Sequence, residues 1–198
     1  MKGFIVTKFY TLDRSGTLSE NQIVNLVNIS TDSLLVEIKN LLNRESIVSR
    51  GNELFPEGIS RHGEQYLLLK KLIVNNPNGL PSDLTPTNPM IEIIFELVRK
   101  SMFPHLPSRM QSIFCWQTLD DLKKFTNDLG FPDNRRLNVF EVETDNFFIG
   151  DMKLLYLGGQ GIHAMSLACM YWSGERTLNP HLEVLVPLPV QVGSRVEI

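Results

Sequence analysis

The spacing of the apolar residues changes along the chain, and this change limits the possible folds more than any other feature. Before Pro107, apolar residues recur at intervals of three and four, which is the period of a helix that buries one face. After Pro107, short runs of β-branched and aromatic residues alternate with turn residues, which predicts strands. We therefore expect an α+β fold in which a helical N-terminal half packs on a mainly antiparallel sheet.

The first hundred residues are predicted to contain one strand, at residues 4–10, and four helices. Ser19 and Gln22 have the spacing of a capping box, which predicts a first helix at about residues 19–27. Apolar stripes predict further helices at about residues 32–42, 60–74 and 87–100. The segment between the last two, residues 75–89, holds four prolines and is predicted to be a surface loop or a seam.

The second half is predicted to be strand-rich, and the whole chain, residues 1–198, to form a single domain. Helices are expected from residue 118 to a stop near Gly130, and at residues 162–172. Strands are expected at residues 112–116, 137–142, 147–156, 182–186 and 190–198. The sheet is therefore built mainly from residues 101–198, with the strand near the N-terminus as a possible addition.

Composition excludes several classes of protein. The 198 residues are 42% apolar and 21% charged with a net charge of -3, which excludes a disordered chain and gives no basic surface for wholesale nucleic-acid binding. The most apolar stretches are short and interrupted, so no membrane span is expected, and the N-terminus lacks a signal-peptide pattern. The two cysteines, Cys115 and Cys169, form no CxxC motif, so we expect no disulfide framework and a cytoplasmic location.

The segment from His181 to Pro187 is the most informative for function. In a strand, His181 and Glu183 project from the same face while Leu182 and Val184 face the core. This places one carboxylate beside an imidazole. The alternative is an edge strand with a solvated polar face.

The run His181-x-Glu183-Val-Leu-Val-Pro resembles the end of the ADP-ribosyltransferase superfamily, in which Gln-x-Glu or Glu-x-Glu precedes an apolar strand and a proline. The resemblance implies an ADP-ribosyltransferase-like fold and a catalytic role for Glu183. His181 occupies the position that is often tied to the choice of acceptor, and there this sequence departs from the family pattern.

Residues 103–114 and 171–174 resemble segments of uncharacterised bacterial and phage proteins placed near the same superfamily. The resemblance, which covers about residues 100–198, implies that Arg109 holds the phosphates of NAD and that Ser112 replaces a strand serine that supports the pocket. Aromatic side chains are needed to stack on nicotinamide, which implicates Phe114, Tyr171 or Trp172. The implied substrate is NAD, with a protein or another macromolecule as acceptor.

The resemblance implies an NAD-dependent mono-ADP-ribosyltransferase, in which a fixed carboxylate stabilises the positive charge that grows on ribose as nicotinamide leaves. Two alternatives stay open: an inactive relative that binds or inhibits a partner, and a nucleic-acid enzyme with a basic patch of Arg99, Lys100, Arg109, Arg135 and Arg136. Simpler interpretations also exist, with Arg109 in a surface ion pair, Ser112 as an ordinary strand serine and the aromatic residues in the core.

Other candidate groups are weaker. Residues 158–161 have glycines before a helix but lack a phosphate-binding signature. The cysteines have no family signature beside any histidine, and the four histidines lack metal-ligand spacing. Glu141 and Glu143 share a strand face and are expected to be solvated. Arg61 and Arg14 are reserve phosphate binders.

Overall fold

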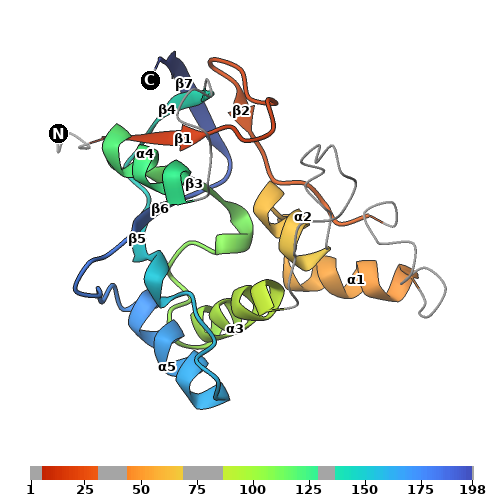
Figure 1. The fold of residues 1–198 in the computed structure, drawn as a ribbon. Helices are drawn as coiled ribbons and strands as arrows, with labels where there is room; N and C mark the ends of the chain where they lie inside the picture. The colour runs from red at the N-terminus through yellow and green to blue at the C-terminus, as the bar shows by residue number, and fades with distance from the viewer. Residues whose placement is uncertain (1–5, 31–43, 69–86, 129–136, 198) are drawn as a thin grey trace, which may run out of the picture.

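The computed structural model describes residues 6–30, 44–68, 87–128 and 137–197. Within these residues, helices cover parts of one seven-stranded sheet, so the fold is α+β (Figure 1). The strands are β1 (Thr7–Leu12), β2 (Ile23–Val24), β3 (Ser112–Trp116), β4 (Val139–Thr144), β5 (Phe148–Asp151), β6 (Leu182–Pro187) and β7 (Val190–Val196). The helices are α1 (Arg44–Leu54), α2 (Arg61–Leu67), α3 (Thr87–Met102), α4 (Leu119–Asp128) and α5 (Gly161–Trp172), with short 3-10 turns η3 (Arg109–Gln111) and η4 (Met152–Leu154).

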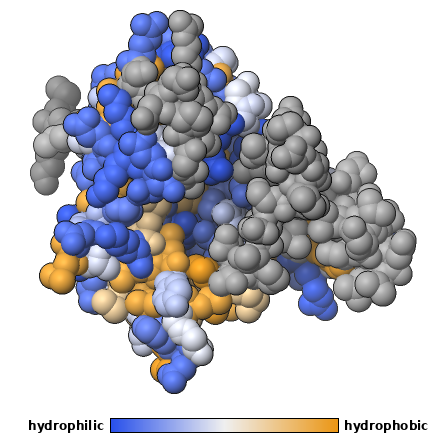
Figure 2. Space-filling view, in the orientation of Figure 1, coloured by the Kyte–Doolittle hydropathy of each residue, from blue (hydrophilic) through white to orange (hydrophobic). Residues whose placement is uncertain are grey.

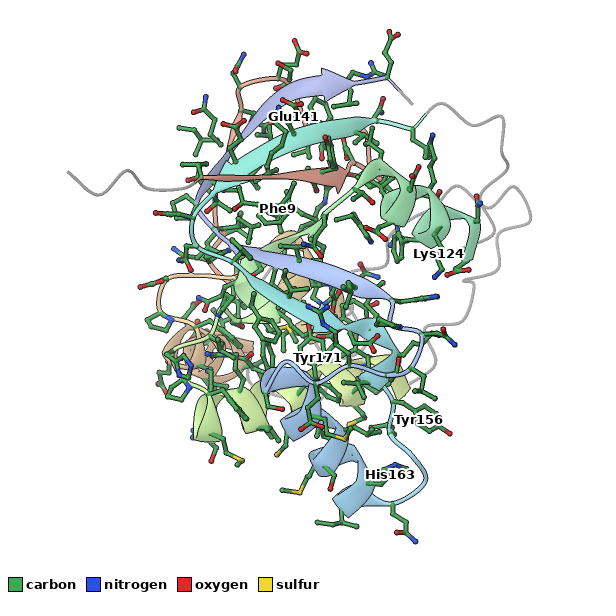
Figure 3. The ribbon with its side chains drawn as sticks, turned by 90° about the vertical axis from the view of Figure 1, so that its left-hand side faces the viewer. Phe9, Lys124, Glu141, Tyr156, His163 and Tyr171 are labelled. Atoms are coloured by element: carbon green, nitrogen blue, oxygen red, sulfur yellow. The ribbon has the colours of Figure 1, made fainter. Side chains whose placement is uncertain are left out.

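The strands follow the order β2-β7-β4-β1-β3-β6-β5, and each neighbouring pair is antiparallel. This order inserts β6, from the end of the chain, between β3 and β5. The sheet curls, and Figure 3 shows Phe9 of β1 on the side of β1 that faces β6. Phe9 accordingly shares a buried cluster with Val184 and Val186 of β6.

Both faces of β6 are buried. Successive side chains of a strand point to opposite faces, so Val184 and Val186 lie inside the curl of the sheet while Leu185 packs against α3 and α5. The alternative prediction of an edge strand with a solvated polar face is therefore wrong for residues 182–187. Because the curl of the sheet covers one face of β6 and helices α3 and α5 cover the other, its one polar residue, Glu183, is buried.

The helices divide one face of the sheet between them. α3 and α5 pack together beside β5 and β6, and Phe95 and Trp172 lie in their shared core. α4 covers the other part of this face, where Leu122 packs against Trp116 of β3. α2 lies against η3 and α3 (Figure 1).

α3 has an unusual distribution of charge. It buries Glu92, Glu96 and Arg99, while Ile93 and Leu97 are exposed. Figure 2 shows a patch of apolar surface in the part of the molecule where α3 and α5 lie. The three buried charges need partners inside the protein, and these partners define the candidate site described below.

Residues 19–27 form no helix, so the prediction of a helix there is wrong. Ser19 and Gln22 do bond to each other, since the Ser19 backbone N–H donates to Gln22 Oε1 at 2.9 Å, but they close a turn. Asn21 has a φ of 60°, which a right-handed helix cannot contain. Ile23 and Val24 then pair with β7, because strand pairing at the sheet edge satisfies their backbone better than a short isolated helix would.

Most other predicted elements within the described residues are confirmed. Ser60 caps α2, since its side chain accepts from the Gly63 backbone N–H at 3.3 Å, and α3, β3, α4, α5, β6 and β7 lie within a few residues of their predicted positions. The strand predicted at residues 147–156 ends at Asp151 and gives way to η4. The helix predicted at residues 32–42, the end of the one at 60–74 and most of the loop at 75–89 lie outside the described residues. In the described part of the chain, no helix has the length and apolarity needed to span a membrane.

Candidate functional site

Four side chains from four separate elements form a buried hydrogen-bonded cluster, which we call the Arg109 cluster: Glu92 of α3, Arg109 of η3, Tyr171 of α5 and Glu183 of β6. Arg109 donates from Nε to Glu92 Oε2 and from Nη2 to Glu92 Oε1, both at 2.9 Å. It also donates from Nη1 to the Tyr171 hydroxyl at 2.7 Å and to Glu183 Oε1. Tyr171 in turn donates to Glu183 Oε1 at 2.7 Å. Arg109 is 3% exposed and Glu183 2%, so the cluster is desolvated and each charge depends on its partners.

A glycine in β5 makes the approach of Tyr171 possible. Gly150 pairs with Glu183 across the sheet, and a Cβ atom at Gly150 would lie 2.3–2.6 Å from the ring and hydroxyl of Tyr171. Any larger residue would therefore displace the tyrosine from its place over the sheet. This close approach explains how a residue of α5 reaches a carboxylate of β6.

A second buried network fixes the chain that leads into Arg109. Arg99 donates to both carboxylate oxygens of Glu96, at 3.0 and 2.8 Å, and to the Leu106 carbonyl at 2.8 Å. Ser108 donates to Glu96 Oε2 at 2.9 Å, and Ser112 Oγ donates to the Ser108 carbonyl at 2.7 Å. Ser112 thus stabilises the turn around Arg109 and forms no hydrogen bond to Glu183.

Partly exposed rings lie beside the cluster. The His62 ring stacks between Phe114, at 4.4 Å between centroids, and Tyr66, at 4.5 Å. The Arg109 guanidinium carbon lies 5.0 Å from the centre of the Phe114 ring, within range of a cation–π interaction. His62 Nε2 is 3.1 Å from Glu92 Oε1, which is within ion-pair distance when His62 is protonated. These rings form the partly exposed side of the site.

The electrostatics of the cluster follow from burial and from its opposite charges. Burial favours the neutral form of Glu92, but the charges of Arg109 and His62 outweigh it and hold the pKa of Glu92 well below its usual range. Burial likewise opposes the charge of Arg109, yet Glu183 and Glu92 raise its pKa further above the usual value. Burial raises the pKa of Tyr171 well above its usual value although Arg109 opposes this, so the hydroxyl remains a donor.

The structure brings together some of the predicted site residues and separates others. Arg109, Glu183, Phe114 and Tyr171 lie together. Trp172 is turned into the core, where its Nε1 donates to the Phe95 carbonyl at 2.8 Å.

His181 lies apart from the cluster, just before β6. Its Nδ1 is 3.3 Å from Asp128 Oδ2, and its backbone N–H donates to Asp151 Oδ1 at 2.9 Å. Asp151 also accepts from the backbone and hydroxyl of Thr177, at 2.8 and 2.7 Å, so it fixes the loop that enters β6. These bonds lower the pKa of Asp151, although burial acts in the opposite direction.

The reserve candidates and the proposed basic patch also have defined places. Arg61 donates to the hydroxyls of Ser15 and Thr17, and its neighbour His62 belongs to the ring stack. Arg99 and Arg109 are both neutralised by buried carboxylates, and Arg135 and Arg136 lie outside the described residues. The two described arginines therefore offer no surface charge to a nucleic acid.

The remaining candidates show no catalytic arrangement. Burial raises the pKa of the Cys115 thiol, which keeps it protonated and unreactive. Cys169 Sγ lies 3.6 Å from Met102 Sδ. Glu141 forms an ion pair with Lys8, with 2.9 Å between Glu141 Oε1 and Lys8 Nζ. His163 lies at the outer end of α5 (Figure 3). Among the described residues, no group of three or more His, Cys, Asp or Glu side chains is placed to hold a metal ion.

Sequence reasoning missed Glu92, Gly150 and Asp151, and it placed His62 only within a polar segment, residues 60–64, that could cap a helix and line a cleft. Glu92 and Glu96 are four residues apart and border the apolar stripe of α3, and this position was the available signal. No local pattern predicts the contact of His62 with Phe114 or that of Gly150 with Tyr171, because the partners are distant in sequence.

Comparison with known proteins gives a family without an assigned activity. No curated protein matches the chain. A family described as "Protein of unknown function (DUF2441)" matches residues 9–198. Because this match covers nearly the whole sequence, the chain belongs to the DUF2441 family.

Proposed function

We propose that this chain is an NAD-dependent mono-ADP-ribosyltransferase that modifies a macromolecular target, with Glu183 as its catalytic carboxylate and an ADP-ribosyltransferase-like fold. The observation that carries the proposal is the fixed position of Glu183, which accepts hydrogen bonds from Arg109 and from Tyr171. Cleavage of the bond between nicotinamide and ribose leaves positive charge on the sugar, and a preorganised carboxylate stabilises that charge without reorganising.

The rings beside the cluster supply the second requirement of the reaction. Phe114, His62 and Tyr66 are the partly exposed neighbours of the buried charges, so nicotinamide is expected to reach Glu183 along them and to stack on one of them. Since Glu183 itself is 2% exposed, binding of NAD requires these rings to move.

The role of Arg109 in this proposal differs from the one that the sequence resemblance implied. Its N–H groups already bond to Glu92, Tyr171 and Glu183, so it positions the catalytic carboxylate. The diphosphate is bound instead by Arg61, beside His62, and by Arg14, whose charge is close enough to Tyr66 to affect the pKa of that hydroxyl. Both side chains are exposed and always charged.

The test is nicotinamide release from NAD by purified protein, compared between wild type and Glu183→Gln. Glutamine keeps the shape of the side chain, so we expect the fold to persist and the rate to fall about 10²–10³-fold. Glu143→Gln, at a 59% exposed strand residue, is the matched control and should keep the wild-type rate. Equal rates for wild type and Glu183→Gln would exclude Glu183 as the catalytic group.

A second function, an inactive member of the same superfamily that binds or inhibits a partner, is favoured by one observation. Arg109 and Glu183 already neutralise each other out of contact with solvent, an arrangement that suits a structural role. This function predicts no nicotinamide release and no rise in melting temperature with millimolar NAD, together with a stable partner in a pull-down. A saturable NAD-dependent rise in melting temperature would contradict it.

A further inference from the structure

Helices α3 and α5 share an exposed apolar surface, which we call the α3–α5 face. Residues 90, 93 and 97 of α3 follow the spacing of one helix face, as do residues 162, 165 and 169 of α5. The two stripes meet where Met102 Sδ lies 3.6 Å from Cys169 Sγ, and Figure 2 shows apolar surface in this part of the molecule. The large apolar residues of the face are 37–69% exposed: Met90, Ile93, Leu97, Met102, Ile162 and Met165.

The exposed positions of these two helices carry no charge of their own. α3 has four charged residues, of which Glu92, Glu96 and Arg99 are buried. The fourth, Lys100, is half-buried and donates to the Leu54 carbonyl at 2.7 Å. α5 contains no Asp, Glu, Lys or Arg. None of the ten exposed residues described in α3 and α5 therefore belongs to these four types.

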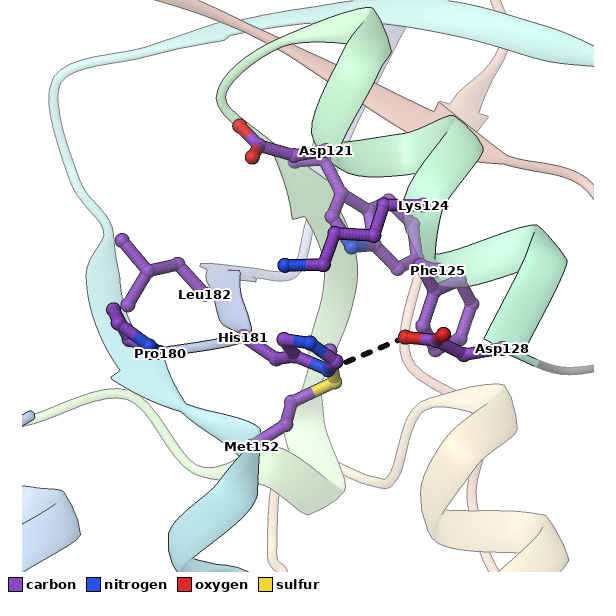
Figure 4. A pocket seen from close by; sticks show the side chains of 9 residues that line it. Asp121, Lys124, Phe125, Asp128, Met152, Pro180, His181 and Leu182 are labelled. Atoms are coloured by element: carbon purple, nitrogen blue, oxygen red, sulfur yellow. Dashed lines mark ion pairs between the residues drawn. The ribbon is translucent and has the colours of Figure 1, made fainter. Parts of the chain in front are cut away.

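Helix α4 shows how differently this chain builds a surface for water. Six of its ten residues are exposed and five of these are charged, among them Asp121, Lys124 and Asp128 in Figure 4. Depletion of charge together with enrichment in methionine is typical of the core of a protein interface, and the α3–α5 face exposes three methionines. Its composition is therefore that of an interface.

The size of the α3–α5 face matches one side of a stable interface. Its six large apolar residues together expose about 600 Å², if an extended chain exposes about 1.45 Å² per dalton. Ser101, His163 and Ser166 are exposed beside them and bring the area close to the roughly 800 Å² that each partner contributes to an interface of standard size. Single proteins seldom leave an apolar patch of more than about 600 Å² in water.

We propose that the α3–α5 face is the interface of a homodimer, in which a second copy of this chain packs its own α3–α5 face against it about a twofold axis. Twofold symmetry sets a patch against a copy of itself, so a charged patch meets charges of its own sign, whereas an uncharged apolar patch is compatible with its copy. Two helices from each copy then pack together as four.

A second copy fits this face better than a lipid surface does. Helices that lie on membranes usually carry Lys and Arg on their polar side. The polar side of α3 is buried in the protein, and α5 has neither residue. The dimer does not depend on the function proposed for Glu183, and its formation is measured without any enzymatic activity.

The first test is the mass of the protein in solution, measured by sedimentation equilibrium from about 0.1 to 100 µM chain. We expect a dimer with a dissociation constant of about 1 µM. Leu97→Glu adds a charge at a 61% exposed helical position, which the monomer tolerates, and should raise this constant about 100-fold. Met165→Glu on α5 should act in the same direction. The control is Ile23→Glu, at a 59% exposed residue of β2 at the other end of the sheet, and it should leave the constant unchanged.

The second test uses Cys169 as a reporter within the face. Since the other cysteine, Cys115, is fully buried, Cys169 is the accessible thiol of the chain. Its rate of alkylation by iodoacetamide should fall about tenfold from 0.1 to 100 µM wild type, and no more than about twofold for Leu97→Glu.

The outcomes against the proposal are distinct. A protein that is monomeric at 100 µM, a dimer in which Cys169 reacts as fast as in the monomer, or equal dissociation constants for Leu97→Glu and Ile23→Glu would each overturn it. A monomer that binds phosphatidylcholine vesicles would assign the face to lipid and would overturn it as well.

Discussion

Replacing Arg109 by methionine tests whether the Arg109 cluster holds the two halves of the fold together. The change removes four hydrogen bonds and leaves two carboxylates, of side-chain exposure 7% and 2%, without their shared counter-ion. Removal of one partner from a buried ion pair costs about 3–5 kcal/mol of the free energy of unfolding. For a chain of this length each 1 kcal/mol lowers the melting temperature by about 2–4 °C, so we expect a fall of about 6–20 °C.

Arg109→Met should also reverse the pH dependence of stability, an effect that a loss of packing alone would not produce. In the wild type the folded-state pKa of Glu92 is lowered, so its contribution to stability is complete above about pH 4.3 and is lost as the pH falls. Without Arg109, burial dominates and should raise the folded-state pKa of Glu92. Stability is then retained at low pH and lost as the pH rises, so Arg109→Met should melt higher at pH 5 than at pH 8.

The assay is thermal unfolding followed by circular dichroism at several pH values. Lys8→Met is the control, since Lys8 pairs with Glu141 on the surface and such a pair contributes little to stability. Arg109→Lys keeps the charge but not the fork that binds Glu92, so its melting temperature should lie between those of wild type and Arg109→Met. A melting temperature of Arg109→Met within error of Lys8→Met, with no reversal of the pH dependence, would refute the reasoning.

Two further predictions concern the supports of the site. Gly150→Ala should lower the free energy of unfolding by about 1–3 kcal/mol, because the new methyl group collides with Tyr171; Gly161→Ala, where a Cβ meets nothing within 4 Å, should not destabilise, and equal melting curves for the two variants would contradict the close approach. Asp151→Ala should cost about 2–4 kcal/mol through the lost bonds to Thr177 and its neighbours. Because the folded-state pKa of Asp151 is lowered, the difference from wild type in denaturant unfolding should be complete above about pH 4 and shrink below it, and a pH-independent difference would contradict this role.

Local sequence patterns predicted those elements whose stability is mostly local or whose faces are both buried. The apolar stripe of α3 and the β-branched runs of β3 and β6 identified these elements. Residues 19–27 misled the prediction because the Gln22 side chain accepts from the Ser19 N–H in a turn just as it would at a helix start. Only pairing with β7 decides between the two structures. Long-range pairing competes with local preference, and a single sequence does not reveal the outcome.

For the site, the sequence by itself identified Glu183 in an apolar strand and Arg109 before the strand at 112–116 as candidate residues. Tertiary structure decided their environment. The curl of the sheet and the packing of α3 and α5 covered both faces of β6 and so buried Glu183, and α3 supplied Glu92, an acid that resembles any surface acid when read in sequence. The physical reason is that the state of a buried charge depends on its desolvation and on its partners, and local spacing encodes neither. The partners of Arg109 are separated from it by 17, 62 and 74 residues in the sequence.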